Sequence, residues 1–292
     1  MSTVHIKAYA KINLYLDVIK KLENGYHTVE TVMHAISLHD TVTVTVNRGV
    51  LPFISLTASD TRLPCNEDNL AYRAAELFYR HRSMDGSISI HIQKNIPIAG
   101  GLAGGSTDAA AVLCALNALC GMPYTTEALC ELSAPLGADV PFCVAANSGI
   151  YVAFGTHYGE RLTFLDAMQP CHIVVAAANE GVSTPWAYRE VDMLPPPSDA
   201  HTPQAMLSAL SEHAPRSTVL AHLYNRFEDA ILPKHTEAYQ NKALLLENGA
   251  FAAMMSGSGP TVIGFFEAEE TAQAACQALT QNGVRAWCST TL

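Results

Sequence analysis

The chain has 292 residues, of which 49% are hydrophobic, and a formal net charge of -10 at pH 7. This hydrophobic content is ordinary for a globular protein and excludes global disorder. The negative charge offers no long-range attraction for nucleic acid or anionic membrane, so we expect neither as a partner.

The N-terminal half alternates between strand and helix patterns. Residues 40–47 alternate strictly and are rich in β-branched side chains, which is typical of a half-buried strand. Residues 109–120 are apolar nearly all round, which indicates a buried helix. In chain order, the patterns predict strands at residues 3–19, 28–38, 40–47, 87–93 and 150–154, and helices at 69–81, 109–120 and 125–132.

The pattern restarts near residues 155–159. We therefore predict an α+β protein of two domains, residues 1–157 and residues 158–292. The second half is expected to hold strands at 171–178 and 261–266, a loop at 194–198 with helical segments after it, and a helix at 269–281.

The eight cysteines contain no C-x-x-C pair, and most have apolar neighbours. We interpret them as free, buried thiols of a cytoplasmic protein, where the redox environment is reducing. The N-terminus has no signal-peptide pattern, and the uncharged stretches at 109–126 and 140–159 contain proline, glycine and asparagine. No membrane span is therefore expected.

A glycine-rich stretch, Ile98-Ala-Gly-Gly-Leu-Ala-Gly-Gly-Ser-Thr-Asp108, precedes the apolar helix. Glycine lets the backbone approach an anion closely, and a helix N-terminus supplies free N–H groups. We expect Ser106, Thr107 and Asp108 to provide the N-cap and first turn of a helix that starts at Ala109. No lysine follows the glycines as it does in a P-loop, and the G-x-G-x-x-G pattern is absent. Taken alone, the stretch is either an anion-binding loop or a flexible turn.

Two charged residues stand in apolar surroundings. Lys11 lies in a strand-like segment, either as a solvated edge residue or as a buried cation beside a carboxylate or phosphate. Asp139 stands before a run that resembles a strand, either as a turn or helix-capping residue or as a catalytic base for a substrate hydroxyl.

Two turns complete the set of motifs. Gly25-Tyr26-His27 joins an aromatic ring to an imidazole, which suits either core packing or stacking on a ring whose edge the histidine reads. Ser256-Gly-Ser-Gly-Pro260 suits either a second anion-binding loop or a hairpin turn.

Together, these motifs resemble the GHMP kinase family, which includes galactokinase, homoserine kinase, mevalonate kinase and phosphomevalonate kinase. The resemblance spans nearly the whole chain. It rests on Ala10-Lys-Ile-Asn-Leu14, Gly25-Tyr-His27, Ile36-Ser-Leu-His-Asp40, Asp68-Asn-Leu70, residues 96–111, residues 136–142 and residues 255–261. It implies a ribosomal-S5-domain-2-like N-terminal half, a ferredoxin-like C-terminal half and an active site in the cleft between them.

The resemblance also implies roles. Asp139 would accept the proton of the acceptor hydroxyl as that group attacks the γ-phosphate, and Lys11 would lie beside it. Tyr26 and His27 would hold a cytosine, and Tyr188 would close the other face of the base. Asn13, Gly257, Ser258 and Gly259 would contact the rest of the substrate. The residues implied for ATP are Asn69, Lys94, Pro97, Gly100, Gly101, Leu102, Ala103, Gly104, Gly105, Ser106 and Thr107.

The implied co-substrate is ATP with Mg²⁺, and Ser106 or Thr107 could reach the metal. The implied acceptor is a small molecule, a cytidine diphosphate-linked methylerythritol, and the implied assembly is a monomer or weak homodimer. The chain departs from the family pattern at Asn24, Ala103, Thr107, Pro135 and His157, where the family commonly has another residue. Ala103 and His157 replace glycines, which leaves the geometry of their loops open.

Two alternatives stay open from the sequence. One is a sister kinase that acts on mevalonate, phosphomevalonate or homoserine, which Gly25-Tyr26-His27 disfavours. The other is a non-catalytic ligand- or RNA-binding protein on the same scaffold, because a fold does not determine a function.

Overall fold

The computed structural model describes residues 1–82, 85–98, 100–195 and 201–292. These residues form two compact units, and each unit is built from three separate segments of the chain. The first unit comprises Met1–Ala10, His39–Ile96 and Ala103–Ile150. The second comprises Lys11–Leu38, Pro97–Leu102 and Tyr151–Leu292. Compactness thus groups the chain differently from a single division after residue 157, which stays a prediction.

Two long strands supply residues to both units. They are β1 (Ser2–Lys21) and β2 (His27–Asn47), which neighbour each other in the strand order β3-β4-β2-β1-β8. The two strands predicted at 28–38 and 40–47 are therefore one, because the alternation of buried side chains resumes without a turn between them. A turn at residues 23–25 joins β1 to β2.

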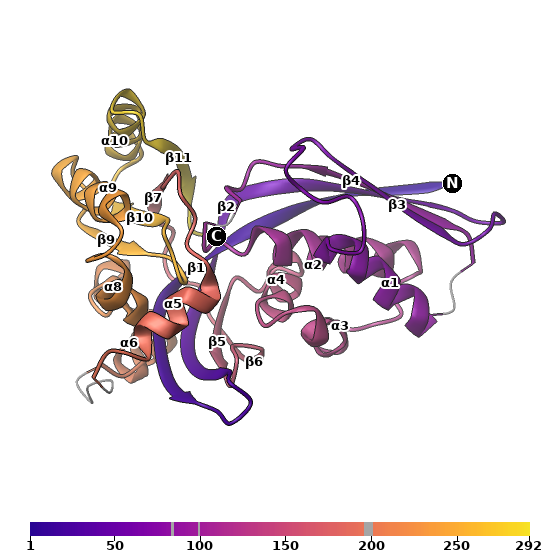
Figure 1. Ribbon diagram of the computed structural model, residues 1–292, viewed down its shortest axis with the longest axis horizontal. Helices are drawn as coiled ribbons and strands as arrows, with labels where there is room; N and C mark the ends of the chain where they lie inside the picture. Colours follow the sequence, from indigo (N-terminus) through magenta and orange to yellow (C-terminus); the bar gives the residue numbers. More distant parts are fainter. Residues whose placement is uncertain (83–84, 99, 196–200) are drawn as a thin grey trace. The chain divides into compact units, whose positions relative to one another are not determined.

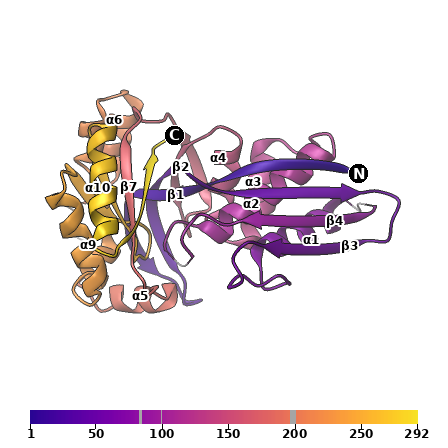
Figure 2. The same ribbon diagram turned by 90° about the horizontal axis from the view of Figure 1, so that it is seen from above.

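In the first unit, helices cover one face of the sheet (Figures 1 and 2). β4 (Ser87–Gln93) runs parallel to β3 (Phe53–Ala58) and antiparallel to the last part of β2. The helix α2 contacts α1, α3 and α4, so its all-round apolar sequence is buried among neighbours. The helices are α1 (Leu70–Arg82), α2 (Gly104–Leu119), α3 (Thr126–Ser133) and α4 (Val140–Asn147), with a 3-10 turn at Ala134–Leu136.

The second unit contains an antiparallel sheet of order β11-β7-β10-β9. Its strands are β7 (His172–Ala177), β9 (Ala252–Met255), β10 (Val262–Phe266) and β11 (Arg285–Thr290). One face is covered by α9 (Thr236–Glu247) and α10 (Glu269–Gln281), as Figure 1 shows. Val174, Leu245, Phe266 and Leu279 belong to the buried cluster between these layers. An α+β layering is thus confirmed.

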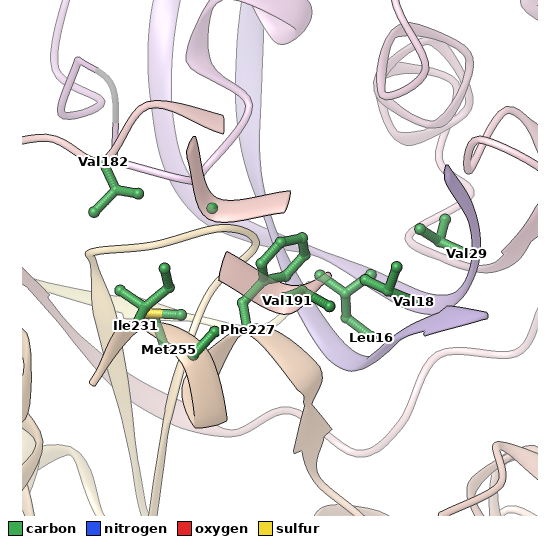
Figure 3. Packing of buried hydrophobic residues seen from close by; sticks show 10 residues of the cluster. Leu16, Val18, Val29, Val182, Val191, Phe227, Ile231 and Met255 are labelled. Carbon is green, nitrogen blue, oxygen red and sulfur yellow. The ribbon is translucent and has the colours of Figure 1, made fainter. Parts of the chain in front are cut away.

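A second hydrophobic cluster of this unit surrounds Phe227 (Figure 3). It joins the ends of β1 and β2 to the helices α5 (Thr184–Val191) and α8 (Arg226–Ile231). The buried members shown are Leu16, Val18, Val29, Val182, Ala187, Val191, Phe227, Ala230, Ile231 and Met255. The remaining elements of the unit are β5 (Val152–Thr156), β6 (Arg161–Leu165), β8 (Tyr224–Asn225), α6 (Gln204–Ser211) and α7 (Arg216–Leu220).

Three expectations are wrong in detail. The helix expected at Ala109 begins at Gly104, because its buried apolar body outweighs the low helix propensity of glycine in the first turn. The run after Asp139 is the helix α4 rather than a strand, since a short apolar run has no distinguishing period. Not all thiols are buried: all eight cysteines are free, but Cys65 and Cys288 are exposed.

Several elements were not predicted at all, namely β3, β6, β8, β9, β11 and α5. Residues 196–198 of the predicted loop and Ala99 of the glycine-rich stretch lie outside the described residues. Within the described ranges, no helix is long and apolar enough to cross a membrane.

Candidate active site

The N-terminus of α2 is the centre of the glycine-rich stretch. Ala103 precedes it in the left-handed conformation, with φ 58° and ψ 28°, and makes no side-chain cap. The first hydrogen bond of the helix joins the backbone N–H of Thr107 to the carbonyl of Ala103. The N–H groups of Gly104, Gly105 and Ser106 therefore have no partner within the helix. A sixteen-residue helix also carries the positive end of its dipole here. The arrangement suits an anion, and Ser106 to Asp108 lie inside the helix rather than at its N-cap.

The two hydroxyls of the first turn are placed differently. Thr107 is fully buried, and its Oγ1 donates a 2.6 Å hydrogen bond to the carbonyl of Tyr9. Ser106 is only partly buried. Ser106 is therefore the better placed of the two to contact a bound group, while Thr107 anchors α2 to β1.

Beneath the start of α2 lies a buried ion cluster of Lys94, Asp40 and Asp108. Lys94 Nζ lies 2.5 Å from Asp40 Oδ2 and 2.8 Å from Asp108 Oδ2, and its side chain is 5% exposed. Asp40 Oδ1 also accepts hydrogen bonds from the backbone N–H groups of Asn95 and Ile96. The cluster thus ties the end of β4, the middle of β2 and the second turn of α2 together.

The electrostatics of this cluster are those of a structural site. Burial opposes the charge of Lys94, but the two carboxylates raise the pKa of its ammonium. Burial, together with the negative charge of Asp40, raises the pKa of Asp108 although Lys94 acts the other way. The ammonium is committed to two carboxylates, so any contact of Lys94 with a nucleotide falls to its backbone. A Cβ on Gly104 would lie 2.9 Å from Lys94 Nζ, so a larger residue there would displace the ammonium from its present position.

Asn69 lies at the start of α1. Its Oδ1 accepts from the N–H of Ala71, and its Nδ2 donates to the carbonyl of Pro64. The side chain caps the helix and fixes the preceding loop, which leaves each end of the amide with one further hydrogen-bonding position. Its role toward adenine stays a prediction.

Asp139 occupies the N-cap position of α4. Its carbonyl accepts the N–H of Cys143, but its side chain makes no cap hydrogen bond. The carboxylate is therefore directed to something other than capping.

In the second unit, Lys11 is a buried cation rather than a solvated edge residue. It is 4% exposed, and its Nζ donates to Asn13 Oδ1 at 2.9 Å. Asn13 Nδ2 donates in turn to Thr31 Oγ1, and Thr31 donates to the carbonyl of Tyr15. This chain of hydrogen bonds across β1 and β2 fixes the side chains of Lys11 and Asn13, which the sequence analysis singled out.

The two glycine-rich segments meet within the second unit. A Cβ on Gly101 would lie 2.2 Å from the carbonyl oxygen of Ser256, and Ser256 Oγ donates to the carbonyl of Gly101. A Cβ on Gly100 would lie 2.7 Å from Thr261 Oγ1. Pro97 and Leu102 are buried in the same segment, and Leu102 accepts the backbone N–H of Lys11.

The second glycine turn is held by Asn225, whose Nδ2 donates to the carbonyls of Met255 and Gly257. Gly257 and Gly259 have φ of 57° and 80°, and Ser258 Oγ lies 3.2 Å from Thr184 Oγ1. The turn is therefore a loop that is fixed at both ends, and its backbone touches the first glycine segment.

The predicted base-binding residues Tyr26, His27 and Tyr188 form two aromatic pairs together with Tyr158, and we call these four residues the aromatic cluster. The Tyr188 ring is stacked on the His27 ring, with centroids 4.7 Å apart and planes 17° apart. Tyr26 is 67% exposed, and its ring lies 5.4 Å from that of Tyr158. The structure thus brings His27 and Tyr188 together directly and leaves most of the Tyr26 ring open.

Sequence reasoning missed the residues that hold these side chains. Asp192 contacts His27, and Asp40 and Asp108 contact Lys94. Asp40 and Asp108 stand within the motifs of the resemblance, but an acidic residue at a strand or helix end has many roles. Asp192 stands in no motif, and only the fold brings it to His27.

The chain matches two family models. The model for the N-terminal domain of GHMP kinases matches residues 69–147, and the model for the C-terminal domain of GHMP kinases matches residues 206–285. The two matches cover the helices α1–α4 of the first unit, and the strands β9 and β10 and the helices α7 to α10 of the second.

Curated relatives share more than a third of the sequence. The 4-diphosphocytidyl-2-C-methyl-D-erythritol kinase of Clostridium acetobutylicum is 38% identical over 272 residues, which is 92% of this chain and 93% of the relative. The enzyme of the same name from Gloeobacter violaceus is 39% identical over 287 residues, which is 96% of this chain and 91% of the relative.

Solved structures agree. A crystal structure of 4-(cytidine 5'-diphospho)-2C-methyl-D-erythritol kinase has a TM-score of 0.78 and 33% identity, and covers 99% of both chains. Homoserine kinase from Cytophaga hutchinsonii has a TM-score of 0.73 at 16% identity, covering all of this chain and 95% of the other. The second likeness concerns the fold alone.

Proposed function

The chain belongs to the 4-diphosphocytidyl-2-C-methyl-D-erythritol kinases of the GHMP kinase family, and we propose that Asp139 and Lys11 carry out its chemistry. The chain is thus an ATP-dependent kinase of the non-mevalonate route to isoprenoid precursors. It phosphorylates the 2-hydroxyl of 4-(cytidine 5'-diphospho)-2-C-methyl-D-erythritol. These relatives do not favour the sister kinases or a non-catalytic protein.

Asp139 acts as the general base. A carboxylate that stands at a helix N-terminus without capping it suits the removal of a proton from the acceptor hydroxyl. Lys11 offsets the negative charge that develops on the transferred phosphoryl group. The burial of Lys11, and its bond to Asn13, support a cation held in one position rather than a mobile surface charge. Transfer is direct and in line, with no covalent intermediate on the enzyme.

The phosphates of ATP lie at the N-terminus of α2. The free N–H groups of its first turn and the close approach that Gly104 and Gly105 allow support this placement. The adenine contacts fall to Asn69 and to the backbone at Lys94 and Pro97. Gly257, Ser258 and Gly259 contact the diphosphate of the acceptor, and Tyr26, His27 and Tyr188 its cytosine.

Mg²⁺ fits this site as a partner of the ATP phosphates. No group of three or more His, Cys, Asp or Glu in the described ranges could hold a metal ion. Mg²⁺ commonly takes most of its ligands from phosphates and water, so one protein oxygen is sufficient. Ser106 would supply that oxygen, because Thr107 is bonded to Tyr9. When bound, the metal would neutralise charge on the β- and γ-phosphates.

The remaining parts of the proposal concern the cellular compartment, the assembly, the partners and the domain boundary. Eight free cysteines support a reducing compartment, the cytoplasm. We propose a monomer or weak homodimer that acts on small molecules, with no nucleic acid or membrane as partner. The proposed boundary between the domains 1–157 and 158–292 lies in the segment between the two family-model matches, which end at residue 147 and begin at residue 206.

The observation that carries the residue assignment is the position of Asp139, and Asp139→Asn tests it. We expect turnover to fall by about 100- to 10,000-fold, because the general base is lost. ATP binding should be retained, because an amide of the same size at this position leaves the start of α2 unchanged. Turnover is measured with the cytidyl substrate, and ATP affinity by calorimetry.

The matched control is Asp85→Asn, which removes the same charge at an exposed position of the same unit. Its turnover should equal that of the unaltered protein. Near-normal turnover in the Asp139 variant would refute the base assignment.

A further inference from the structure

Asp192 ends the helix that carries Tyr188. Its backbone N–H donates to the carbonyl of Tyr188, and it follows Val191, the last residue of α5. The helix is fixed by the hydrophobic cluster of Figure 3, in which Val191 and Ala187 are buried and against which Tyr188 packs. The backbone of Asp192 is therefore fixed by the fold, while the residue itself is exposed at the surface.

This carboxylate lies close to two donors, one from the last residue of β1 and one from the first residue of β2. His27 Nε2 lies 2.7 Å from Oδ1, and Lys21 Nζ lies 2.5 Å from Oδ2. Burial acts to raise the pKa of Asp192, but the hydrogen bonds from Lys21 and His27 outweigh it and lower the pKa. Asp192 is thus ionised at neutral pH and can only accept, so Nε2 of His27 must carry a proton.

The tautomer of His27 decides what its other nitrogen can recognise. A neutral imidazole with its proton on Nε2 has a lone pair on Nδ1, which accepts a hydrogen bond. No residue in the described ranges is hydrogen-bonded to Nδ1 of His27. Stacking on Tyr188 fixes the plane of the ring, so the direction of this lone pair is also fixed.

Cytosine and uracil differ in the group that such an acceptor meets. The exocyclic amino group of cytosine donates, whereas the corresponding oxygen of uracil only accepts. An acceptor at Nδ1 therefore accepts a hydrogen bond from the amino group of cytosine. With uracil, two acceptors face each other and no hydrogen bond forms.

We propose that Asp192 is a positioning residue that determines base specificity: it keeps the proton of His27 on Nε2, so that Nδ1 accepts from the cytosine amino group and rejects uracil. This inference rests on the proposed function, in which His27 contacts the base. It assigns the choice between the bases to a residue that contacts neither the substrate nor ATP.

Asp192→Asn reverses the hydrogen-bonding pattern without changing the size of the side chain. Lys21 can only donate, so it takes the amide oxygen, and the amide N–H₂ is left to face His27. His27 Nε2 must then accept, and the proton moves to Nδ1. The histidine becomes a donor toward the base, which suits uracil.

The test compares turnover of the cytidine diphosphate-linked substrate with that of its uridine diphosphate-linked analogue. We expect the ratio of kcat/KM for cytidine over uridine to fall by at least about 10-fold in Asp192→Asn, since a hydrogen bond is replaced by a mismatch. The change should appear in the KM for the acceptor and leave the KM for ATP unaltered. Asp192→Glu retains a carboxylate and should keep a preference for cytosine.

Glu190→Gln is the matched control. It makes the same acid-to-amide change on α5, at a side chain that pairs with Lys234 and not with His27. Its ratio should equal that of the unaltered protein. A fall as large as that of Asp192→Asn would overturn the proposal, because a general effect on α5 would then explain both.

Nitrogen-15 NMR of His27 tests the tautomer in the unaltered protein and needs no variant. A proton on Nε2 and an unprotonated Nδ1 are expected; the opposite tautomer would overturn the proposal. Normal turnover with an unchanged base ratio in Asp192→Asn would overturn it as well. No turnover of the cytidyl substrate by the unaltered protein would refute the proposed function, and this inference with it.

Discussion

The start of α2 and the aromatic cluster, the two proposed binding regions, are built in different ways. The first presents backbone N–H groups and glycines, and its charged residues, Lys94, Asp40 and Asp108, are paired with one another beneath it. The second presents side chains, and its charged residue, Asp192, acts directly on His27. One region depends on the path of its backbone, and the other on the chemistry of its side chains.

This difference predicts which changes each region tolerates. At the start of α2, substitutions should act through stability and backbone geometry. In the aromatic cluster they should act through affinity and specificity for one substrate, with little effect on the free energy of unfolding.

The largest effect is expected from Lys94→Met. Removal of the ammonium leaves Asp40 and Asp108 buried without a cation, which should lower the free energy of unfolding by about 3–5 kcal/mol. Lys242→Met, which breaks a partly exposed pair with Glu228, should cost about 1 kcal/mol or less. Chemical denaturation measures both. Equal losses would mean that the buried cluster does not support the start of α2.

Gly101→Ala tests the contact between the two glycine-rich segments. The new methyl group would lie 2.2 Å from the Ser256 carbonyl at a φ of 74°, so we expect a loss of about 2–4 kcal/mol and a higher KM for ATP. Gly283→Ala has a similar φ of 80° with nothing within 4 Å, and isolates the cost of backbone conformation. The two variants should differ in denaturation midpoint; identical midpoints would refute a close contact.

Tyr26→Ala should change substrate affinity and leave stability nearly unaltered. Loss of an exposed stacking surface should raise the KM for the cytidyl substrate by about 10-fold, since stacking on one base contributes about 1–3 kcal/mol. The KM for ATP and the unfolding free energy should change little. Tyr239→Ala removes a similarly exposed tyrosine elsewhere in the same unit and should change neither KM. An equal rise in both KM values for Tyr26→Ala would argue against a cytosine platform.

The smallest effect is expected from Ala103→Gly. Ala103 has a φ of 58°, which costs an L-residue about 1 kcal/mol that glycine does not incur. The variant should therefore be more stable by about 1 kcal/mol, with unaltered ATP affinity. Ala118→Gly, at an exposed position of the same helix, should lose about 1 kcal/mol. A loss of stability in both variants would contradict the strain at Ala103.

The sequence predicted the regular elements with clear periods. The strand Ser87–Gln93 and the helix Glu269–Gln281 have the predicted bounds. It failed where two tendencies compete: the glycines of α2 indicated a loop, and the apolar run of α4 indicated a strand. The departures at Ala103 and His157 fall at positive φ, where glycine is the least strained residue.

The candidate site was predictable to a similar extent. Residues within motifs, such as Lys11 and Asn13, are brought together by the alternation of a single strand and its neighbour. The contact of Asp192 with His27 was not predictable from the sequence. The two residues are 165 positions apart, and their contact depends on how α5 packs. Local patterns do not contain that information.

The measurement that tests the account most directly is an ATP-dependent assay that offers diphosphocytidyl-methylerythritol and mevalonate side by side, with the product identified by mass. The account predicts that the cytidyl substrate alone gains one phosphate, at the expense of ATP. Phosphorylation of mevalonate, with the cytidyl compound left unchanged, would contradict it.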